Sequence, residues 1–349
     1  MAQWHESIPS LGRTEVLVVG SGAAGSTAAI AAARAGADVV LIEKLPFLGG
    51  TSTAVLDTFY GFFTPGEYAH KVVGGIPDEV VAGLEGRGRV VRRPNTYGAG
   101  SGITYNPQHL KLTWEELVTD AGVRVLLHCF VQDVRVVDSR VTEVLFATKS
   151  GLRRIEAATV VDASGDADVC AFAGFGFERA GEFEPSQTLT TTFSMVGVDW
   201  EQRRTISKEQ LHELMGQAHD AGYDLPRREG SDHITPFPTV SATVMTRLDA
   251  VEELETGVIG IEDPDFLTQA EIEGRRQAAE YARFLRDQGQ PQYLEEITAG
   301  GDEEGEEGDL GFGGGGEGAN DLYDQAVAIV TREGKASTSF VQRHLQIGY

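Results

Sequence analysis

The sequence predicts an α/β fold that opens with a parallel sheet, and three adjoining segments support this prediction. Residues 14–20, Thr-Glu-Val-Leu-Val-Val-Gly, are rich in β-branched side chains and end in glycine. A run of small residues at 26–35 follows, and a second β-branched segment occupies residues 38–42. Strands that are apolar throughout are typical of parallel sheets buried on both faces, and a helix between two such strands forms their crossover.

The turn between the first strand and the helix carries three glycines at the spacing that suits a bound dinucleotide. Gly20 permits the tight turn, Gly22 lets the backbone approach a pyrophosphate, and Gly25 lets the helix pack closely on the strand. The helix N-terminus then offers free N–H groups to the phosphates. Glu43 ends the second strand, 18 residues after Gly25, where its carboxylate can accept hydrogen bonds from both hydroxyls of an adenosine ribose. The positions between the glycines are predicted to belong to the same site: Ser21, Ala23 and Ala24.

A pair of glycines, Gly49 and Gly50, follows the second strand closely. With this pair, residues 16–52 resemble the FAD-dependent oxidoreductases of the glutathione-reductase-like Rossmann fold. In such enzymes the pair lets the chain run beside the diphosphate and the flavin, and plain NAD dehydrogenases do not usually have it. The resemblance implies FAD as the cofactor, with these further binding residues: Glu43, Lys44, Gly49, Gly50, Thr51 and Ser52.

A second cofactor contact is expected where the apolar strand at 159–162 ends. The residues that follow it are Ala163, Ser164, Gly165 and Asp166. The resemblance implies that this strand end packs against the dinucleotide, and that the backbone near Val131 meets the adenine. The alternative is an ordinary strand-to-helix turn in which Asp166 or Asp168 is the N-cap. We favour the cofactor contact because the first motif precedes it.

The resemblance extends to about residue 288 and gives an FAD-binding domain at 1–180 and an incomplete, mixed α+β substrate domain at 181–289. We expect a helix from residue 107 to about 121, ended by Gly122, and a β-meander over about 123–158. The first strand of the meander, 123–130, is expected to continue into 131–137. Thr268 is predicted to cap a helix near the end, with Glu271 at its third position. Two segments have less pattern and fit a substrate domain and loops over the flavin: 57–105, and 185–246 with a helix at 208–221.

The chain changes character after residue 288. Residues 290–319 hold nine acids, ten glycines and no Lys or Arg, which predicts a disordered, self-repelling linker. Residues 290–296 and 320–349 resemble the motor end and the partial C-terminal winged-helix module of FtsK-type DNA translocases. The resemblance implies a helix-turn-helix tail without its recognition helix, and no Walker A motif occurs in the sequence. The alternative to an oxidoreductase is therefore an inactive, truncated fusion remnant with a DNA-translocase-like tail, joined near 284–288.

Composition sets further limits. The 349 residues carry a net charge of −24, from 53 acids and 29 bases, which argues against a surface that grips nucleic acid or anionic lipid. The linker holds nine of the acids and ten of the 43 glycines, so neither excess is uniform. Cys129 and Cys170 are far apart and form no CxxC, which predicts two free thiols in a cytoplasmic protein. Neither a signal peptide nor a membrane span is expected.

The implied function is flavin-mediated hydride or two-electron transfer on an unidentified small substrate, with an unknown electron acceptor. The motifs identify no catalytic side chain and no metal site. His70, Arg92, Arg93 and His109 are candidates for acid–base help, but a surface role is favoured for each of them.

Overall fold

The computed structural model describes residues 7–59, 70–94, 101–179, 181–183, 185–254 and 257–289. The chain divides into two compact units, Met1–Pro291 and Gln292–Tyr349. The second unit lies outside the described residues, and so do the predicted linker at 290–319 and the predicted winged-helix module at 320–349. The described fold therefore belongs to the first unit.

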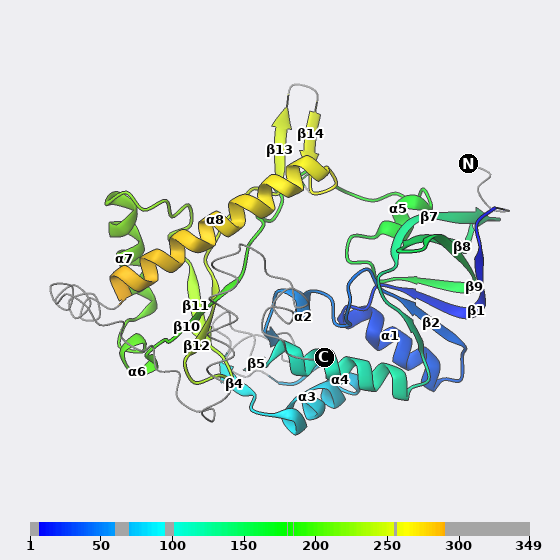
Figure 1. The fold of residues 1–349 in the computed structure, drawn as a ribbon, viewed down its shortest axis with the longest axis horizontal. Helices are drawn as coiled ribbons and strands as arrows, with labels where there is room; N and C mark the ends of the chain where they lie inside the picture. Colours follow the sequence, from blue (N-terminus) through cyan, green and yellow to red (C-terminus); the bar gives the residue numbers. More distant parts are fainter. Residues whose placement is uncertain are drawn as a thin grey trace, which may run out of the picture. The chain divides into compact units, whose positions relative to one another are not determined.

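A six-stranded sheet organises the first half of this unit (Figure 1). Its order is β6-β2-β1-β9-β8-β7. The strands β6, β2, β1 and β9 run parallel to one another, and β8 is antiparallel to both of its neighbours, β9 and β7. Val18 pairs with both Leu41 and Val161, which confirms the predicted parallel arrangement. The strands are β1 (Ser10–Val19), β2 (Val39–Ile42), β6 (Arg124–Leu126), β7 (Phe130–Val137), β8 (Arg140–Thr148) and β9 (Gly151–Asp162).

The prediction for the start of the β-meander is wrong. Residues 123–137 do not form one continued strand, because β6 and β7 lie at opposite edges of the sheet. The chain turns between them at His128, whose φ of 57° is left-handed. Cys129 then donates its backbone N–H to the carbonyl oxygen of Glu43 at 2.9 Å. The meander therefore consists of β7, β8 and β9, and β9 runs on as one strand into the parallel part of the sheet.

One face of the sheet is covered by the helices α1 (Ala23–Arg34), α3 (Ile76–Arg87) and α4 (Pro107–Asp120) (Figure 1). Ile30, Leu84 and Trp114 from these helices pack with Val18 and Leu41 in one core. The helix predicted from residue 107 is confirmed as α4. The helix α3 corrects the prediction for 57–105, because its apolar side belongs to the core of the nucleotide-binding half rather than to a substrate domain. The other face carries α5 (Asp168–Phe172).

The second half of the unit contains a three-stranded antiparallel sheet, β10-β12-β11, and two long helices, α7 and α8. The helix predicted at 208–221 is confirmed as α7. Leu211 and Met215 pack with Tyr281 and Phe284 from α8 in a separate core. The remaining elements are α2 (Thr51–Ala54), β3 (Thr58–Phe59), β4 (Val91–Pro94), β5 (Ser101–Thr104), β10 (Phe193–Val196), α6 (Trp200–Arg203), α7 (Lys208–Asp220), β11 (Ser231–Ile234), β12 (Val240–Val244), β13 (Val251–Leu254), β14 (Gly257–Gly260) and α8 (Pro264–Gly289).

The predicted start of the last helix is wrong by five residues. The helix α8 begins at Pro264, and the carboxylate of Asp263 accepts the backbone N–H groups of Asp265 and Phe266 at 3.0 and 2.9 Å. Thr268 lies inside the helix and donates its hydroxyl to the carbonyl oxygen of Pro264. Pro at the first helical position and Asp before it are a stronger start signal than Thr and Glu four and seven residues later. Among the described helices, none has both the length and the apolar composition to cross a bilayer.

Candidate cofactor and substrate site

The three motif glycines lie where β1 meets α1, and each has a different environment. Gly20 has a φ of 93°, and a Cβ there would lie 2.2 Å from the carbonyl oxygen of Ala163. A Cβ on Gly25 would lie 1.9 Å from the carbonyl oxygen of Gly20. By contrast, a Cβ on Gly22 would meet no atom within 4 Å. The turn and the close packing that the spacing predicts are therefore present, and the backbone at Gly22 is open on the side where a ligand would approach.

The glycine pair after β2 packs directly against this turn. Gly49 donates its N–H to the carbonyl oxygen of Ser21 at 2.9 Å and has a φ of 106°. Gly50 has a φ of 52°, and a Cβ there would lie 2.9 Å from the Cα of Gly22. Both positions favour glycine because residues with a Cβ atom rarely adopt a positive φ. The two glycine-rich turns thus form one continuous backbone wall.

The carboxylate of Glu43 is buried, with 4% of the residue exposed, and its hydrogen bonds stay within the chain. One oxygen accepts the backbone N–H of Ser21 at 2.8 Å and its hydroxyl at 2.6 Å. The other accepts the N–H of Leu45 at 2.8 Å. A carboxylate has about four lone-pair sites, so three bonds leave about one for a ribose hydroxyl. Glu43 therefore fastens β2 to the glycine turn, and the predicted ribose contact has room for one bond rather than two.

The end of β9 forms the third wall. Asp162 accepts the hydroxyl of Ser164 at 2.7 Å and the backbone N–H of Cys170 at 2.9 Å. Burial by itself raises the pKa of Asp162, but the hydrogen bonds from Ser164 and Cys170 outweigh it and lower that pKa. Neither Asp166 nor Asp168 caps α5. The N-cap is Ala167, and the hydroxyl of Ser164 accepts the N–H of Asp168.

These walls enclose a cavity of about 330 Å³, here called the nucleotide cavity. The predicted residues that line it are Gly20, Ser21, Gly22, Glu43, Lys44, Gly50, Thr51, Val131, Ala163, Ser164, Gly165 and Asp166. The predicted residues that do not line it are Ala23, Ala24, Gly25, Gly49 and Ser52. Ala54, Val55 and Asp168 also line it and were not predicted. Its position beyond the carboxyl ends of parallel strands is the usual place for a ligand in such sheets.

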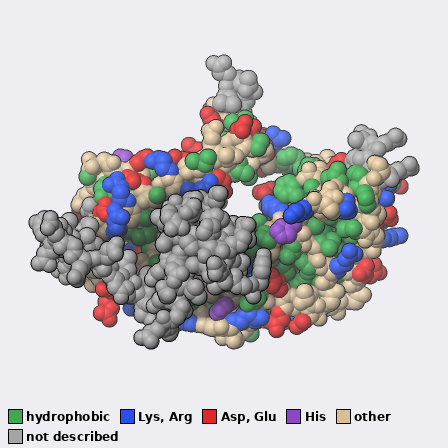
Figure 2. Space-filling view, viewed as in Figure 1, with side chains coloured by type: hydrophobic (Ala, Val, Ile, Leu, Met, Phe, Trp, Pro, Cys, Tyr) green, Lys and Arg blue, Asp and Glu red, His purple; other side chains and the backbone are tan. Residues whose placement is uncertain are grey.

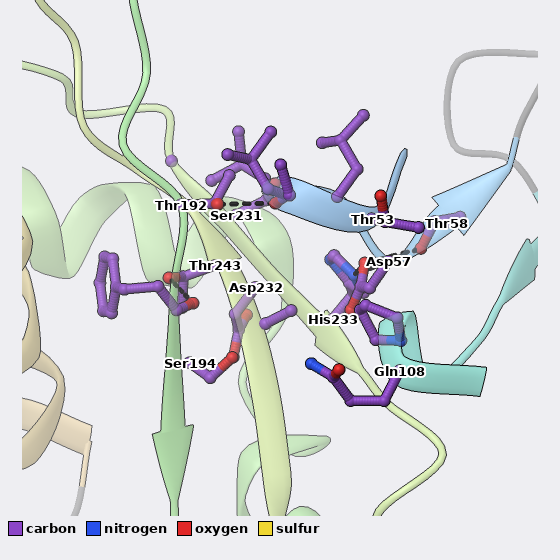
Figure 3. A pocket seen from close by; sticks show the side chains of 18 of the residues that line it. Thr53, Asp57, Thr58, Gln108, Thr192, Ser194, Ser231, Asp232, His233 and Thr243 are labelled. Atoms are coloured by element: carbon purple, nitrogen blue, oxygen red, sulfur yellow. Dashed lines mark hydrogen bonds and ion pairs between the residues drawn. The ribbon is translucent and has the colours of Figure 1, made fainter. Parts of the chain in front are cut away.

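A larger cavity of about 780 Å³, here called the substrate pocket, lies between α2, α4 and the β10-β12-β11 sheet (Figure 3). Ala54 and Val55 line both cavities, so the two meet at the end of α2. The hydroxyl of Thr192, the residue before β10, donates to the carbonyl oxygen of Val55 at 2.7 Å. This hydrogen bond connects the junction of the two cavities to the β10 side of the pocket.

A histidine–aspartate pair lies in the substrate pocket. The Nε2 atom of His233, on β11, lies 2.8 Å from a carboxylate oxygen of Asp57, which follows α2. Both side chains are about one-sixth exposed, at 16% and 17%. Thr58 donates its hydroxyl to the same carboxylate at 3.0 Å. Figure 3 shows Asp57, Thr58, His233 and Gln108 together on one side of the pocket.

The other charged groups of the pocket differ in how they are paired. Arg203 binds Asp232 through two nitrogens, with Nε 2.9 Å from the carboxylate. Lys111 places its Nζ 3.7 Å from the centre of the Phe47 ring. These contacts hold two of the four Lys and Arg side chains of the pocket in place.

Comparison with known protein families identifies the family of the chain. Residues 15–334 match the family described as FAD dependent oxidoreductase. The chain belongs to this family. The match covers most of the chain, and membership of this family supports FAD as the cofactor.

Individual relatives match shorter stretches of this chain. The DNA translocase FtsK of Caulobacter vibrioides is 62% identical over 84 residues, 24% of this chain and 10% of that protein. The probable fumarate reductase Ifc3 of Shewanella frigidimarina is 43% identical over 67 residues, 19% of this chain and 11% of that protein. The chain spans about a tenth of the length of these relatives. Among solved structures, a flavoprotein/dehydrogenase from Cytophaga hutchinsonii is 17% identical with a TM-score of 0.43, covering 67% of this chain and 56% of that one.

The residues of the nucleotide cavity fit the dinucleotide part of FAD. Gly22 is the N-cap of α1, and no side chain caps this helix, so its first N–H groups stay available for a diphosphate although Ala23 and Ala24 do not themselves line the cavity. Glycine at the positive-φ positions Gly20 and Gly50 lets the two glycine turns and the end of β9 pack closely together, because a Cβ there would meet Ala163 or Gly22. Glu43 retains about one lone-pair site for a ribose. The described chain therefore presents an uncapped helix start, an open backbone at Gly22 and a carboxylate around one cavity.

Sequence reasoning missed the polar groups of the substrate pocket. Asp57 and His233 are 176 residues apart, and no local pattern marks either one. The earlier candidates lie elsewhere: His70 and His109 line neither cavity, and Arg92 pairs with Glu85 at 2.6 Å. The side chain of Arg93 lies outside the described residues. Cys129 and Cys170 are free, as predicted, and burial raises the pKa of the Cys129 thiol.

Proposed function

We propose that this FAD-dependent oxidoreductase transfers two electrons, as a hydride, between a small molecule in the substrate pocket and FAD. The observation that carries the proposal is that Ala54 and Val55 line both cavities. A cofactor that enters the glycine turns with its diphosphate has a continuous path to the substrate pocket. FAD supplies the two-electron redox chemistry when it is bound, and the chain supplies binding, orientation and exclusion of water.

The pair of His233 and Asp57 supports proton transfer in the same pocket. The carboxylate of Asp57 takes the Nε2 side of the ring, so neutral His233 carries its proton on Nε2 and a lone pair on Nδ1. In the part of the chain that the structure describes, no hydrogen bond to Nδ1 is formed. An imidazole with one nitrogen bound to a carboxylate and the other available can accept a proton from a substrate. The paired carboxylate then stabilises the positive charge of the imidazolium.

Purification of the full chain tests the proposal. We expect a yellow protein whose visible spectrum has the flavin bands, and release of FAD upon denaturation. A colourless protein that takes up no added FAD would contradict the proposal and would support the alternative of an inactive fusion remnant. The substrate and the electron acceptor are open to a screen on the FAD-loaded chain.

The FtsK-like segment makes DNA binding a second candidate function, and we infer that the chain does not bind DNA. Its net charge of −24 opposes phosphate binding. On the described face in Figure 2, Lys and Arg side chains are interspersed with Asp and Glu. A gel shift with duplex DNA at low and high salt checks this inference, and a salt-sensitive retarded band would contradict it.

A further inference from the structure

The substrate pocket has a charge of opposite sign to the chain as a whole. Its lining includes Lys111, Arg203, Lys208 and Arg227, against Asp57 and Asp232, which is a net charge of +2 with His233 neutral. The whole chain carries −24. A cavity lined by an excess of one charge concentrates ligands of the opposite charge, here anions.

One of these cations, Arg227, lacks a carboxylate partner among the described residues. Its Nε atom is buried and makes no hydrogen bond, and its Nη1 lies 3.4 Å from the carbonyl oxygen of Val244, which is a long contact. Buried polar groups are nearly always hydrogen-bonded, so the unpaired Nε atom leaves the guanidinium short of partners. An anion in the pocket cannot reach this enclosed nitrogen, but it can bind the terminal nitrogens of the same guanidinium.

The backbone of Arg227 is fixed, so the orphan side chain is not a consequence of a loose loop. The hydroxyl of Tyr281, on α8, accepts the N–H of Arg227 at 2.8 Å and donates to its carbonyl oxygen at 2.6 Å. Tyr281 is fully buried, and burial raises its pKa to about 12, so its hydroxyl keeps the proton that the second bond needs. The guanidinium therefore starts from a rigid point at the wall of the pocket.

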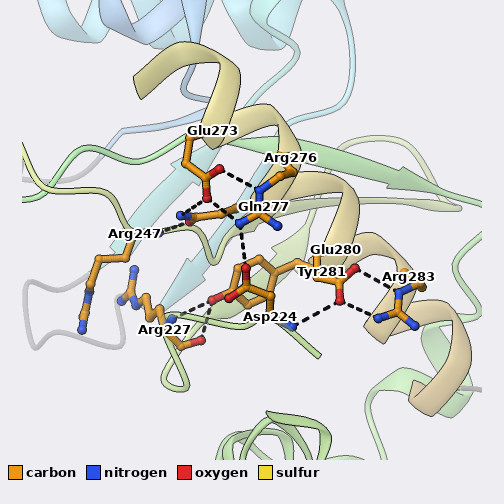
Figure 4. Close-up of polar contacts among 9 residues, drawn as sticks. All are labelled: Asp224, Arg227, Arg247, Glu273, Arg276, Gln277, Glu280, Tyr281 and Arg283. Carbon is orange, nitrogen blue, oxygen red and sulfur yellow. Dashed lines mark hydrogen bonds and ion pairs between the residues drawn. The ribbon is translucent and has the colours of Figure 1, made fainter. Parts of the chain in front are cut away.

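Neighbouring arginines show the contrast. Arg276 binds Glu273 and Asp224 at 2.7 Å, and Arg283 binds Glu280. Figure 4 shows these ion pairs as dashed lines, whereas the dashed lines at Arg227 reach only its backbone. Among the described residues, Arg227 therefore differs from these neighbours in having no acid to neutralise its charge at the cavity.

We propose that the substrate pocket binds a small organic acid whose carboxylate is held by Arg227, and this rests on the proposed function. A guanidinium presents paired N–H donors that match the two oxygens of a carboxylate. Along β11, residues 231 and 233 are about 7 Å apart at 3.4 Å per residue. Arg227 approaches the level of residue 231, because Ser231 pairs with Val244 across the sheet. A small acid can therefore place its carboxylate at Arg227 and an adjoining O–H or N–H group near His233.

The oxidation balances in this arrangement. When bound, FAD would supply the two-electron acceptor, so that one hydrogen could leave the substrate carbon with both bonding electrons. The other leaves the neighbouring oxygen or nitrogen as a proton, to Nδ1 of His233, and the substrate becomes a carbonyl or imine compound. Arg227 stays protonated throughout and acts by binding.

Calorimetric titration of the FAD-loaded full chain tests the inference. The probes are succinate and benzoate, each compared with its neutral amide, succinamide or benzamide. We expect a carboxylate to bind about tenfold or more tightly than its amide, since a hydrogen bond to a charged group contributes about 1.5–3 kcal/mol. Arg227→Met should remove this preference, and Arg227→Lys should keep part of it. Arg247→Met is the matched control, because Arg247 lies nearby but lines a different cavity and pairs with Glu229.

Three results would overturn the inference: neither carboxylate binds to the parent chain, carboxylates and amides bind equally, or Arg227→Met keeps the preference. Retention of FAD and of the far-ultraviolet circular dichroism spectrum shows that each variant is folded. A parent chain that holds FAD but rejects both carboxylates refutes this inference alone. A parent chain that holds no FAD refutes the proposed function.

Discussion

The nucleotide cavity and the substrate pocket meet at Ala54 and Val55 but are built in different ways. The cavity's charged lining is Lys44 against Glu43, Asp166 and Asp168, a net charge of −2, although it suits a cofactor with an anionic diphosphate. The pocket's lining has a net charge of +2. The nucleotide cavity can suit an anionic group despite its net charge because it offers backbone N–H groups and glycine to its ligand, whereas the substrate pocket offers side chains.

Backbone and side-chain sites fail in different ways when they are mutated. A backbone site is sensitive to any added Cβ, and the effect depends on where that Cβ points. A side-chain site tolerates small changes of shape but loses function when one charged group is removed. Substitutions on each side of the junction can therefore separate the two sites experimentally.

The largest effect on catalysis is expected in the substrate pocket from His233→Gln. Loss of the proton acceptor should slow FAD reduction by about 100-fold, with FAD still bound. Stopped-flow bleaching of the flavin by a panel of 2-hydroxy and 2-amino carboxylic acids measures this. His109→Gln is the control, since His109 lines neither cavity. Equal rates for His233→Gln and the parent would remove His233 from the chemistry.

Gly25→Ala should damage the nucleotide cavity through the fold. The new Cβ would lie 1.9 Å from the carbonyl oxygen of Gly20, so α1 must move away from β1. We expect a loss of about 3 kcal/mol in the free energy of unfolding, the upper part of the range for overpacking. Urea denaturation measures it. A variant as stable as the parent would show that the helix has room to shift.

Gly22→Ala is the matched change that should spare the fold. Gly22 has a φ of −59° and ψ of −176°, which alanine adopts, and its Cβ would meet no atom of the described chain. The methyl group would instead occupy the approach to the diphosphate. We expect unchanged urea denaturation of the FAD-free protein and about tenfold or more weaker FAD binding. Fluorescence titration with FAD decides this, and unchanged affinity would mean that the cofactor does not pass Gly22.

Asp162→Asn should have the smallest effect, and it should depend on pH. The pKa of Asp162 is lowered in the folded state, so its contribution is present above the unfolded value of about 3.9 and is lost as the pH falls through the folded value. Asparagine would place its NH2 group where one carboxylate oxygen of Asp162 accepts a hydrogen bond, so two donors would face each other. We expect a loss of about 1 kcal/mol near neutral pH, because Asp162 is only partly buried. Denaturation curves of variant and parent should converge in acid, and a constant difference would exclude the ionised carboxylate as the cause.

Much of the nucleotide cavity was predictable because its parts are short and local. The three motif glycines and the glycine pair lie within 31 consecutive residues, 20–50, and each has one dominant physical role. The errors came where a tertiary contact overrode a local pattern. His128 turns the chain after β6, so β7 joins the far edge of the sheet, and Asp263 caps α8 five residues before Thr268.

By itself, the sequence determined the parallel sheet, the glycine turns and the cofactor class, because backbone geometry near glycine depends on neighbours along the chain. Only the tertiary structure decided that Glu43 turns inward to Ser21, and that Asp57 meets His233. It also decided that Arg227 faces a cavity without a carboxylate partner among the described residues. Such pairings join residues that are remote in the chain, and their energies depend on burial and distance, which no local pattern encodes.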